Sequence, residues 1–206
     1  MKRLLLFFGP DGSGKTTIAK ASAEHLRKKG LKVKVSWMRG THTFASFIAV
    51  FLSKFAVFKG TANPYYNISI PEKLRKVWQA IEFVSALPIV LLRYTIPTAC
   101  GFYVVGERCP IDFIVWVAFT TEDESYLNGF ASRTLRNLTL KKSKAVYITA
   151  DLNTLLSRRK DITPNKLSIQ QRLYRKISVS VNAYTLNTTE KTPQVSLEKL
   201  TVLLQL

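Results

Sequence analysis

Residues 9–17 read Gly-Pro-Asp-Gly-Ser-Gly-Lys-Thr-Thr, and this stretch constrains the fold more than any other part of the chain. Its first eight residues fit the phosphate-binding loop pattern G-x-x-x-x-G-K-[ST], which follows a strand and opens a helix. Both elements are indicated, because an apolar run at residues 4–8 precedes the loop and a helical pattern at residues 17–28 follows it. The sequence therefore predicts a nucleotide-binding fold that begins with strand, loop and helix.

Each residue type in the loop suits contact with phosphate. Glycines have no Cβ, so the backbone can take positive φ and turn its N–H groups towards phosphate oxygens at the helix N-terminus. Lys15 is expected to place its ammonium on the β- and γ-phosphates of ATP and to act in catalysis, and the Thr16 hydroxyl is expected to ligate Mg²⁺. The predicted nucleotide-binding residues span the loop and the start of the helix: Gly9, Asp11, Gly12, Ser13, Gly14, Lys15, Thr16 and Thr17.

Apolar runs and helical patterns alternate along the rest of the chain, which is typical of a parallel sheet with crossover helices. We predict five strands, at residues 4–8, 31–37, 102–105, 145–149 and 183–188. We predict helices between and after them, at residues 17–28, 44–58, 72–93, 111–119, 126–140, 151–159, 168–179 and from 192 onward, with a loop at 59–71. The expected fold is α/β, a P-loop NTPase three-layer sandwich whose five-stranded parallel sheet is flanked by helices, in a single domain over residues 1–206.

Charge and hydropathy limit the possible partners and the cellular location of the protein. The chain has 31 basic and 13 acidic residues and a net charge of +18, so nucleic acid or an anionic membrane surface stays open beside a solvated basic surface. The longest apolar run, at residues 83–92, is shorter than the roughly 20 residues of a membrane span. We therefore expect a cytoplasmic protein without a transmembrane segment. Cys100 and Cys109 have no metal-like spacing, which favours free thiols.

Further candidates follow the other predicted strands, because ligands of open parallel sheets bind beyond the carboxyl ends of the strands. Glu107 follows the third strand and is a candidate to hold Mg²⁺ through water or to orient the acceptor; a salt bridge to Arg108 is the alternative. Arg39 and Arg108 are placed to bracket an acceptor phosphate, for which guanidinium offers bidentate geometry. Arg158 and Arg159 lie beyond the fourth strand, before a polar stretch suited to a mobile segment.

Three stretches together resemble the thymidylate kinase family. The loop sequence has an Asp before its second glycine, as in that family. Residues 104–109, Val-Val-Gly-Glu-Arg-Cys, are similar to the family's strand that ends in Asp-Arg-Tyr or Asp-Arg-His, and residues 147–151 followed by Leu155, Arg158 and Arg159 are similar to its fourth strand and the start of its lid. An arginine midway along the helix before the third strand is part of the family pattern, and Leu87 stands near that position here.

The resemblance implies a nucleoside monophosphate kinase that transfers the ATP γ-phosphate to a pyrimidine nucleotide, with dTMP as first candidate. It implies that Asp11 contacts the acceptor's sugar, that a lid covers about residues 158–170 with Arg158 and Arg159 as catalytic groups, and that the chain forms a homodimer through the apolar helix at 44–58. Two alternatives stay open. One is a kinase of the same framework with another phosphate or hydroxyl acceptor, including a nucleic-acid end; the other is a non-enzymatic nucleotide-binding or membrane-associated module.

Overall fold

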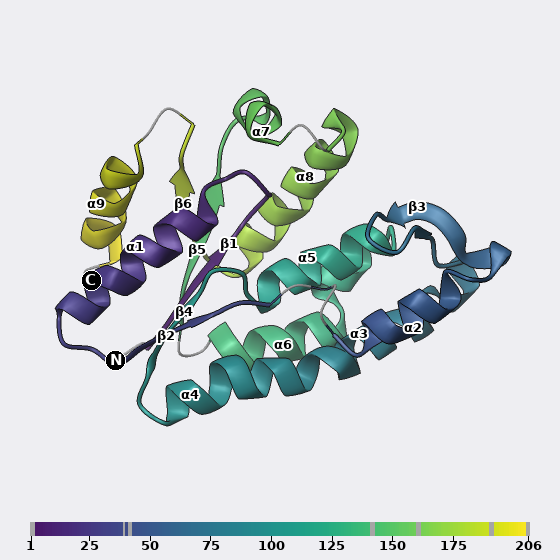
Figure 1. Cartoon of the computed structure of the whole chain (residues 1–206), viewed down its shortest axis with the longest axis horizontal. Coiled ribbons are helices and arrows are strands. Elements are labelled where there is room, and N and C mark those ends of the chain that lie inside the picture. Colours follow the sequence, from purple (N-terminus) through teal and green to yellow (C-terminus); the bar gives the residue numbers. More distant parts are fainter. Residues whose placement is uncertain are drawn as a thin grey trace.

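The computed structural model, shown in Figure 1, describes residues 3–38, 40, 43–140, 143–159, 162–189 and 192–204. Its centre is a five-stranded sheet in which every pairing is parallel. From one edge to the other the order is β2 (Val33–Ser36), β4 (Tyr103–Gly106), β1 (Leu4–Phe8), β5 (Ser143–Thr149) and β6 (Tyr184–Asn187). The predicted α/β class with a five-stranded parallel sheet is confirmed.

Helices cover both faces of this sheet. On one face α1 (Lys15–Lys28) packs beside α9 (Pro193–Leu204), and the opposite face carries α5 (Pro110–Thr120) and α8 (Pro164–Ser180), as Figure 1 shows. The central strand β1 is buried along its whole length, which explains its continuous apolar sequence. Its alternate residues feed two cores, Leu5 and Phe7 on the α1 side and Leu4, Leu6 and Phe8 on the other.

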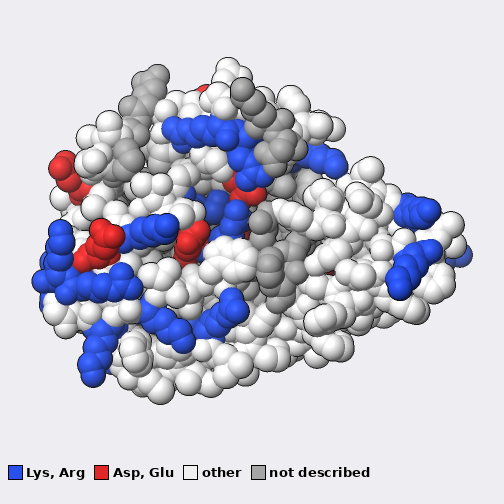
Figure 2. Space-filling model, in the orientation of Figure 1, with Lys and Arg blue, Asp and Glu red and all other residues white. Residues whose placement is uncertain are grey.

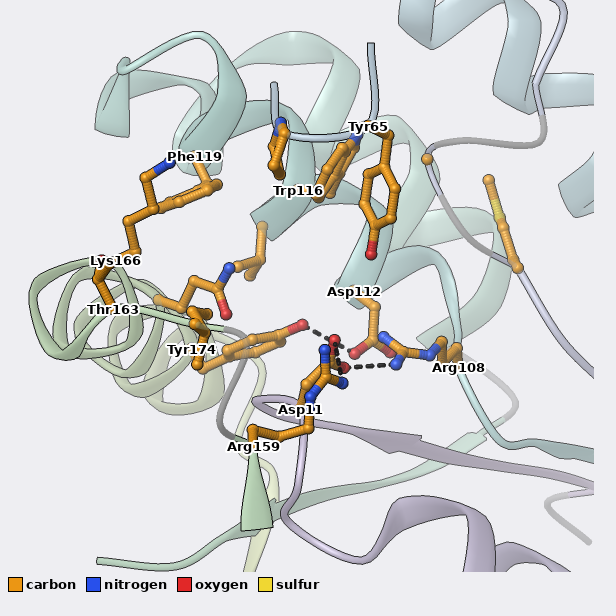
Figure 3. Close-up of a pocket in the computed structure, with 16 residues that line it drawn as sticks. Asp11, Tyr65, Arg108, Asp112, Trp116, Phe119, Arg159, Thr163, Lys166 and Tyr174 are labelled. Carbon is orange, nitrogen blue, oxygen red and sulfur yellow. Dashed lines mark hydrogen bonds and ion pairs between the residues drawn. The ribbon is translucent and has the colours of Figure 1, made fainter. Parts of the chain in front are cut away.

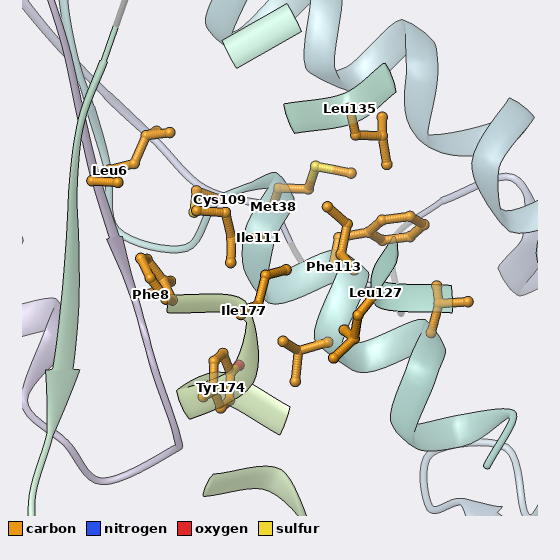
Figure 4. Packing of buried hydrophobic residues seen from close by; sticks show 14 of the residues in the cluster. Leu6, Phe8, Met38, Cys109, Ile111, Phe113, Leu127, Leu135, Tyr174 and Ile177 are labelled. Carbon is orange, nitrogen blue, oxygen red and sulfur yellow. The ribbon is translucent and has the colours of Figure 1, made fainter. Parts of the chain in front are cut away.

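The larger core lies between the sheet and the helices on its far side. Figure 4 shows Leu6 and Phe8 of β1 facing Ile111 of α5 and Ile177 of α8, with Phe113 deeper among the helices. Tyr126 and Leu127 of the 3₁₀ turn Glu124–Asn128 and Leu135 of α6 (Phe130–Leu140) also belong to this core. This packing fixes α5 and α8 against the carboxyl end of β1, where the phosphate-binding loop begins.

The helix predicted at residues 72–93 is part of a longer run. It starts with a 3₁₀ turn at Glu72–Leu74 and continues through α3 (Arg75–Val90), a π-helical turn at Leu91–Thr95 and α4 (Ile96–Ala99). These 28 residues are long and apolar enough to cross a membrane by length and composition alone, although 33% of the relevant window is buried inside the protein. The expectation of no transmembrane segment rested on the short apolar run at residues 83–92, and length and composition alone do not overturn it.

The region between β2 and α3 differs most from the prediction. The helix expected at 44–58 is α2 (Ala45–Leu52) followed by a separate 3₁₀ turn at Ala56–Phe58, and the expected loop contains β3 (Lys59–Asn63), which bridges to Ile68. The chain leaves the helix so that Phe58 and Ile68 can pack with Ala45, Ala49 and Trp78 in a separate small core. Tertiary packing therefore overrides the helical pattern of this stretch.

The expected lid is also partly helical. Of residues 158–170, Arg158 ends α7 (Leu152–Arg158), and α8 begins at Pro164, four residues earlier than predicted. Proline is well suited to the first turn of a helix, where its missing N–H has no helical partner to lose. The polar stretch that was expected to be mobile therefore supplies the first turn of α8.

Candidate functional site

The phosphate-binding loop joins β1 to α1 with its three glycines in the left-handed or mirror-image region of backbone space. The φ angles of Gly9, Gly12 and Gly14 are 147°, 86° and 90°. A Cβ at Gly9 would lie 2.0 Å from the Ile148 carbonyl oxygen on β5, so the close approach of the two strand ends also requires glycine there. The buried Ser13 Oγ has no hydrogen-bond partner among the described residues, which leaves a polar atom inside the loop for a ligand.

Lys15 is folded back on the loop. Its buried ammonium donates hydrogen bonds of 2.7 Å to the carbonyl oxygens of both Gly9 and Pro10 and lies 3.9 Å from the Asp11 carboxylate. Burial, together with the nearby Arg108 guanidinium, lowers the pKa of Lys15 to about 8 despite the surrounding carboxylates. The shift comes first from burial, which penalises the charged ammonium, so an anionic phosphate placed beside Lys15 would favour its charged form.

Thr16 and Glu107 meet across the carboxyl edge of the sheet. The Thr16 hydroxyl donates a 2.6 Å hydrogen bond to Glu107 Oε1, and the Glu107 N–H donates to Ser36 O at the end of β2. Among the described residues no three His, Cys, Asp or Glu side chains gather into a metal site. A hydroxyl and one carboxylate are nevertheless the protein share expected for Mg²⁺, which keeps most of its ligands as water and phosphate oxygens.

Asp11 lies between two arginines from distant parts of the chain. Its Oδ1 accepts from the Arg108 guanidinium, and its Oδ2 is 3.3 Å from the Arg159 guanidinium. Burial would raise the pKa of Asp11, but Lys15 and the two arginines outweigh it and hold the pKa at about 2. Asp11 thus stays ionised at neutral pH and holds both guanidinium groups beside the loop.

A second carboxylate, Asp112, fixes the loop to the helices behind it. Its Oδ1 accepts from the Gly9 N–H at 3.3 Å and from the Tyr174 hydroxyl at 3.0 Å, and its Oδ2 accepts from the Cys109 N–H at 2.9 Å, capping α5. Burial raises the pKa of Asp112 although Lys15 and Arg108 oppose the shift. The position of the first loop glycine therefore depends on α5 and α8 as well as on β1.

A cavity of about 360 Å³ opens beside the loop, and its two ends differ in character. Figure 3 shows Asp11, Arg108, Asp112 and Arg159 gathered at one end and the rings of Tyr65, Trp116 and Phe119 at the other. The Tyr65 and Trp116 rings are 5.2 Å apart between centroids. Charge next to the phosphate loop and aromatic surface away from it suit a ligand with an anionic group and a flat ring.

Two of the predicted arginines separate in the structure. Arg159 reaches Asp11 and lines the cavity, whereas the Arg158 guanidinium donates to Gly12 O and to Thr188 O, each at 3.2 Å. Arg158 therefore lies on the side of the loop that borders β6 and α9, in a smaller hollow with Thr17 and Ser196. Arg39 lies outside the described residues, and Leu87 packs against the main core and supplies no charge to the cavity.

The cavity wall contains residues that the sequence analysis did not single out. From α5 come Asp112, Val115, Trp116 and Phe119; from α8 and the residue before it come Thr163, Lys166, Gln170 and Tyr174. Both sets follow the three- and four-residue spacing of one helix face. The sequence signal that could have identified these cavity residues was this spacing. It places polar and aromatic side chains on one face of each helix.

Comparisons with known proteins agree with this architecture. The family described as "ATPase family associated with various cellular activities (AAA)" matches residues 5–93, which is less than half of the chain and includes the phosphate-binding loop. A search of curated protein sequences gives no match. Among solved structures, the YorR protein from Bacillus subtilis in complex with phosphorylated GDP is similar, with a TM-score of 0.53 and 16% identity over 98% of this chain and 95% of that one.

The deoxyadenosine kinase from M. mycoides with bound dCTP has the same TM-score of 0.53 and 16% identity, over 98% of each chain. The chain has a P-loop NTPase fold. Similarity at this level extends over the whole length of both structures, so it includes the sheet and the helices that line the cavity as well as the loop. It establishes the fold; the activity has to be argued from the site.

Proposed function

We propose that the protein is an ATP-dependent phosphotransferase that phosphorylates a nucleotide bound in the cavity beside the phosphate loop. The observation that carries this proposal is the polarity of that cavity, with Arg108 and Arg159 at the loop end and Tyr65 and Trp116 at the other. Its volume of about 360 Å³ falls in the range of roughly 300–1,000 Å³ that is usual for small-molecule sites.

ATP fits the loop as the structure presents it. The backbone of residues 9–16 would hold the β- and γ-phosphates, and Lys15 would exchange its contacts with two loop carbonyls for phosphate oxygens. Thr16 and Glu107 would hold Mg²⁺, which supplies charge neutralisation between the phosphates when bound. Arg158 lies on the far side of Gly12 from the cavity, where it would support the bound ATP rather than the acceptor.

The acceptor would be held by residues from four separate segments. A guanidinium has five N–H donors in a planar fork, so Arg108 can keep Asp11 as a partner and still bind an acceptor phosphate. Arg159 would approach the same phosphate from the α7 side, and the aromatic end of the cavity would hold the base. Transfer between two positioned phosphates needs alignment and charge neutralisation more than a strong base.

The resemblance of the loop and of the Glu107-Arg108 stretch to thymidylate kinases makes dTMP the first candidate acceptor. A nucleoside hydroxyl is the second candidate, because one structural neighbour is described as a deoxyadenosine kinase. A phosphate acceptor uses both cavity arginines, whereas a nucleoside would leave them bound to Asp11.

Turnover with labelled ATP tests the proposal against a panel of dTMP, dCMP, AMP, GMP, thymidine and deoxyadenosine. We expect dTMP to be phosphorylated fastest. Faster phosphorylation of a nucleoside would move the proposal to the hydroxyl acceptor. No transfer to any acceptor, combined with normal ATP binding, would contradict the proposed activity and favour a non-enzymatic nucleotide-binding module.

A further inference from the structure

The helical run Glu72–Ala99 is apolar on its solvent-facing side as well as in much of its buried side. Gln79, Glu82 and Ser85 are buried on its inner face. Its exposed positions instead carry apolar residues spaced by three or four: Val77, Ala80, Val84, Pro88, Leu92 and Ile96. A surface helix of a globular protein normally carries polar residues on its outer side, so this exposed apolar stripe is suited to an apolar partner.

Helix α2 adds aromatic side chains to the same part of the molecule. It packs against α3 through Ala45 and Ala49, which contact the core around Trp78. Its other side exposes Phe47, with 74% of its surface accessible, and Phe51, with 58%. Solvent-facing phenylalanines on α2 and valines on α3 together form what we call the apolar face. Exposed apolar surface of this extent marks an interaction site.

The charged side chains within residues 44–99 are mostly basic, although Lys76 is paired with Asp123 from outside this range. Residues 44–99 contain six basic and two acidic residues, and of the acidic ones Glu82 is buried. The basic residues are Lys54, Lys59, Lys73, Arg75, Lys76 and Arg93. In Figure 2 the end of the molecule formed by α2 and β3 shows Lys and Arg side chains amid otherwise uncharged surface. The partner should therefore be apolar and negatively charged.

We propose that the apolar face docks on an anionic phospholipid bilayer. Phenylalanine rings of α2 would enter the boundary between headgroups and acyl chains, where aromatic and aliphatic side chains of interfacial helices lie, and the neighbouring Lys and Arg side chains would contact the headgroups. The inference rests on this face alone and holds whatever acceptor the cavity binds.

The inner face of the run argues against a segment that spans the bilayer. Gln79 donates to Thr121 Oγ1 at 3.1 Å and to Asp123 at 2.9 Å, and Trp78, Ala86 and Val90 are buried within the protein. Removing the run from the fold would break these contacts and place Glu82 in hydrocarbon, which is costly. The run therefore stays packed on the domain, with only its outer face available to lipid.

Charge also argues against a second copy of the chain as the partner. A two-fold interface places the same surface patch on both subunits. The basic residues that border the apolar face would then meet one another with Glu72 as the one exposed acidic residue of residues 44–99. An anionic lipid surface satisfies both the apolar and the basic parts of this face.

Vesicle co-sedimentation of the full chain tests the proposal. Vesicles of phosphatidylcholine with about 30% phosphatidylglycerol should bind the protein, and pure phosphatidylcholine should bind it at least about fivefold more weakly. Because a net charge of +18 alone attracts anionic lipid, the decisive variants leave the charge unchanged. Val84→Ser and Phe47→Ser should each weaken binding at least about threefold.

The matched control is Val179→Ser, because Val179 is a valine on α8, away from this face, and is at least as exposed, with 76% of its surface accessible against 63% for Val84. Equal binding of Val84→Ser, Val179→Ser and the unmodified protein would overturn the proposal, as would the absence of vesicle binding. A dimer in sedimentation velocity that Val84→Ser converts to a monomer would also overturn it in favour of a second copy.

A second readout uses the native thiols. Cys100 is exposed directly after the apolar run, whereas Cys109 is buried. A polarity-sensitive dye on Cys100 should shift its emission to the blue with anionic vesicles, and the shift should shrink in Val84→Ser but persist in Val179→Ser. An emission spectrum unchanged by vesicles would contradict insertion of this face.

Discussion

Asp112 beside the phosphate loop and Glu82 in α3 are both buried carboxylates, with 5% and 2% of their surfaces exposed. Asp112 accepts three hydrogen bonds, from Gly9, Tyr174 and Cys109, and has Lys15 and Arg108 nearby. Among the described residues, Glu82 accepts one long hydrogen bond, of 3.4 Å, from the Thr43 hydroxyl. Within the part of the chain that the structure describes, the Asp112 carboxylate is thus well satisfied, while the Glu82 carboxylate has one weak partner.

This difference in hydrogen bonding between Asp112 and Glu82 suits two different roles for the regions around them. Around the loop, side chains from the loop itself, α5, α8 and the residue after α7 fix one another, as the proposed phosphotransfer site would require. In α3, Glu82 is buried with one weak partner among the described residues, while Val77 and Val84 are exposed to solvent. A helix of this kind makes sense when its outer face is covered by something other than water. The predictions below test the two regions separately.

The largest effect is expected for Lys15→Ala, which removes the ammonium next to the transferred phosphate. Turnover should fall by on the order of 100-fold or more, because the charge is needed most in the transition state. The fold should survive, since the two loop carbonyls that Lys15 now holds can turn to water. Steady-state kinetics with thermal melting checks this, and near-normal kcat would exclude the proposed mechanism.

Asp112→Ala should mainly affect stability. The substitution leaves the Tyr174 hydroxyl and two backbone N–H groups without their acceptor, and each buried unpaired group costs about 1–3 kcal/mol. We expect a loss of at least about 2 kcal/mol in the free energy of unfolding, measured by urea titration. Asp151→Ala provides the control, because Asp151 is an exposed cap of α7 and should matter much less. Similar losses in both variants would contradict the anchoring role of Asp112.

Replacing Arg158 and replacing Arg159 should affect different steps, ATP binding and use of the acceptor. Arg159→Ala should lower kcat/KM for the acceptor at least about tenfold, equivalent to about 1.4 kcal/mol, because its guanidinium lines the cavity. Arg158→Ala should instead weaken ATP binding, because its guanidinium contacts Gly12 and Thr188. Isothermal titration with ATP and acceptor kinetics measure the two effects. Equal changes in both assays for both variants would argue for a shared lid role instead.

Much of the fold was predictable because its signals are local. The phosphate loop needs a strand before it and a helix after it, and the apolar runs of β1, β4 and β5 are typical of buried parallel strands. β3 was not predictable, because Gly60 and Asn63 disfavour strands and its partner Ile68 is reached only through tertiary packing. Thr163-Pro164 is a typical helix start, with a cap residue followed by proline in the first turn, and it marks the beginning of α8. The predicted helix began at residue 168 because Thr163-Pro164 was interpreted as part of a mobile segment.

For the candidate site, the sequence marks the loop and the strand ends but not the cavity. Asp11, Glu107 and Arg108 follow strands, so their meeting beside the loop follows from sheet topology. Trp116 lies on a helix face whose direction is set by how α5 packs on β1 and α8. The divergence of Arg158 and Arg159 depends on the backbone at the end of α7, where Arg159 is already extended. Neither feature is encoded in spacing alone.

The smallest effect concerns Glu82 and depends on pH. Burial raises its pKa to about 8, against 4.5 for an ordinary glutamate, with the Thr43 hydrogen bond opposing the shift. Between these values the folded state binds more protons than the unfolded state, so the contribution of Glu82 to stability falls as pH rises from about 4.5 to about 8. Glutamine has the same shape without the titration. Glu82→Gln should therefore change the free energy of unfolding little at pH 5.

At pH 9 the same variant should be more stable than the unmodified protein by at least about 1 kcal/mol, because it avoids an ionised carboxylate with one weak partner. Glu124→Gln is the control. Lys176 and Arg172 lower the pKa of Glu124, so this carboxylate is ionised at both pH 5 and pH 9. The effect of Glu124→Gln on the free energy of unfolding should therefore be the same at the two pH values. Urea titrations at the two pH values measure the difference. If Glu82→Gln shows the same stability change at both, Glu82 is ionised throughout and must have a partner, which would remove the contrast with Asp112.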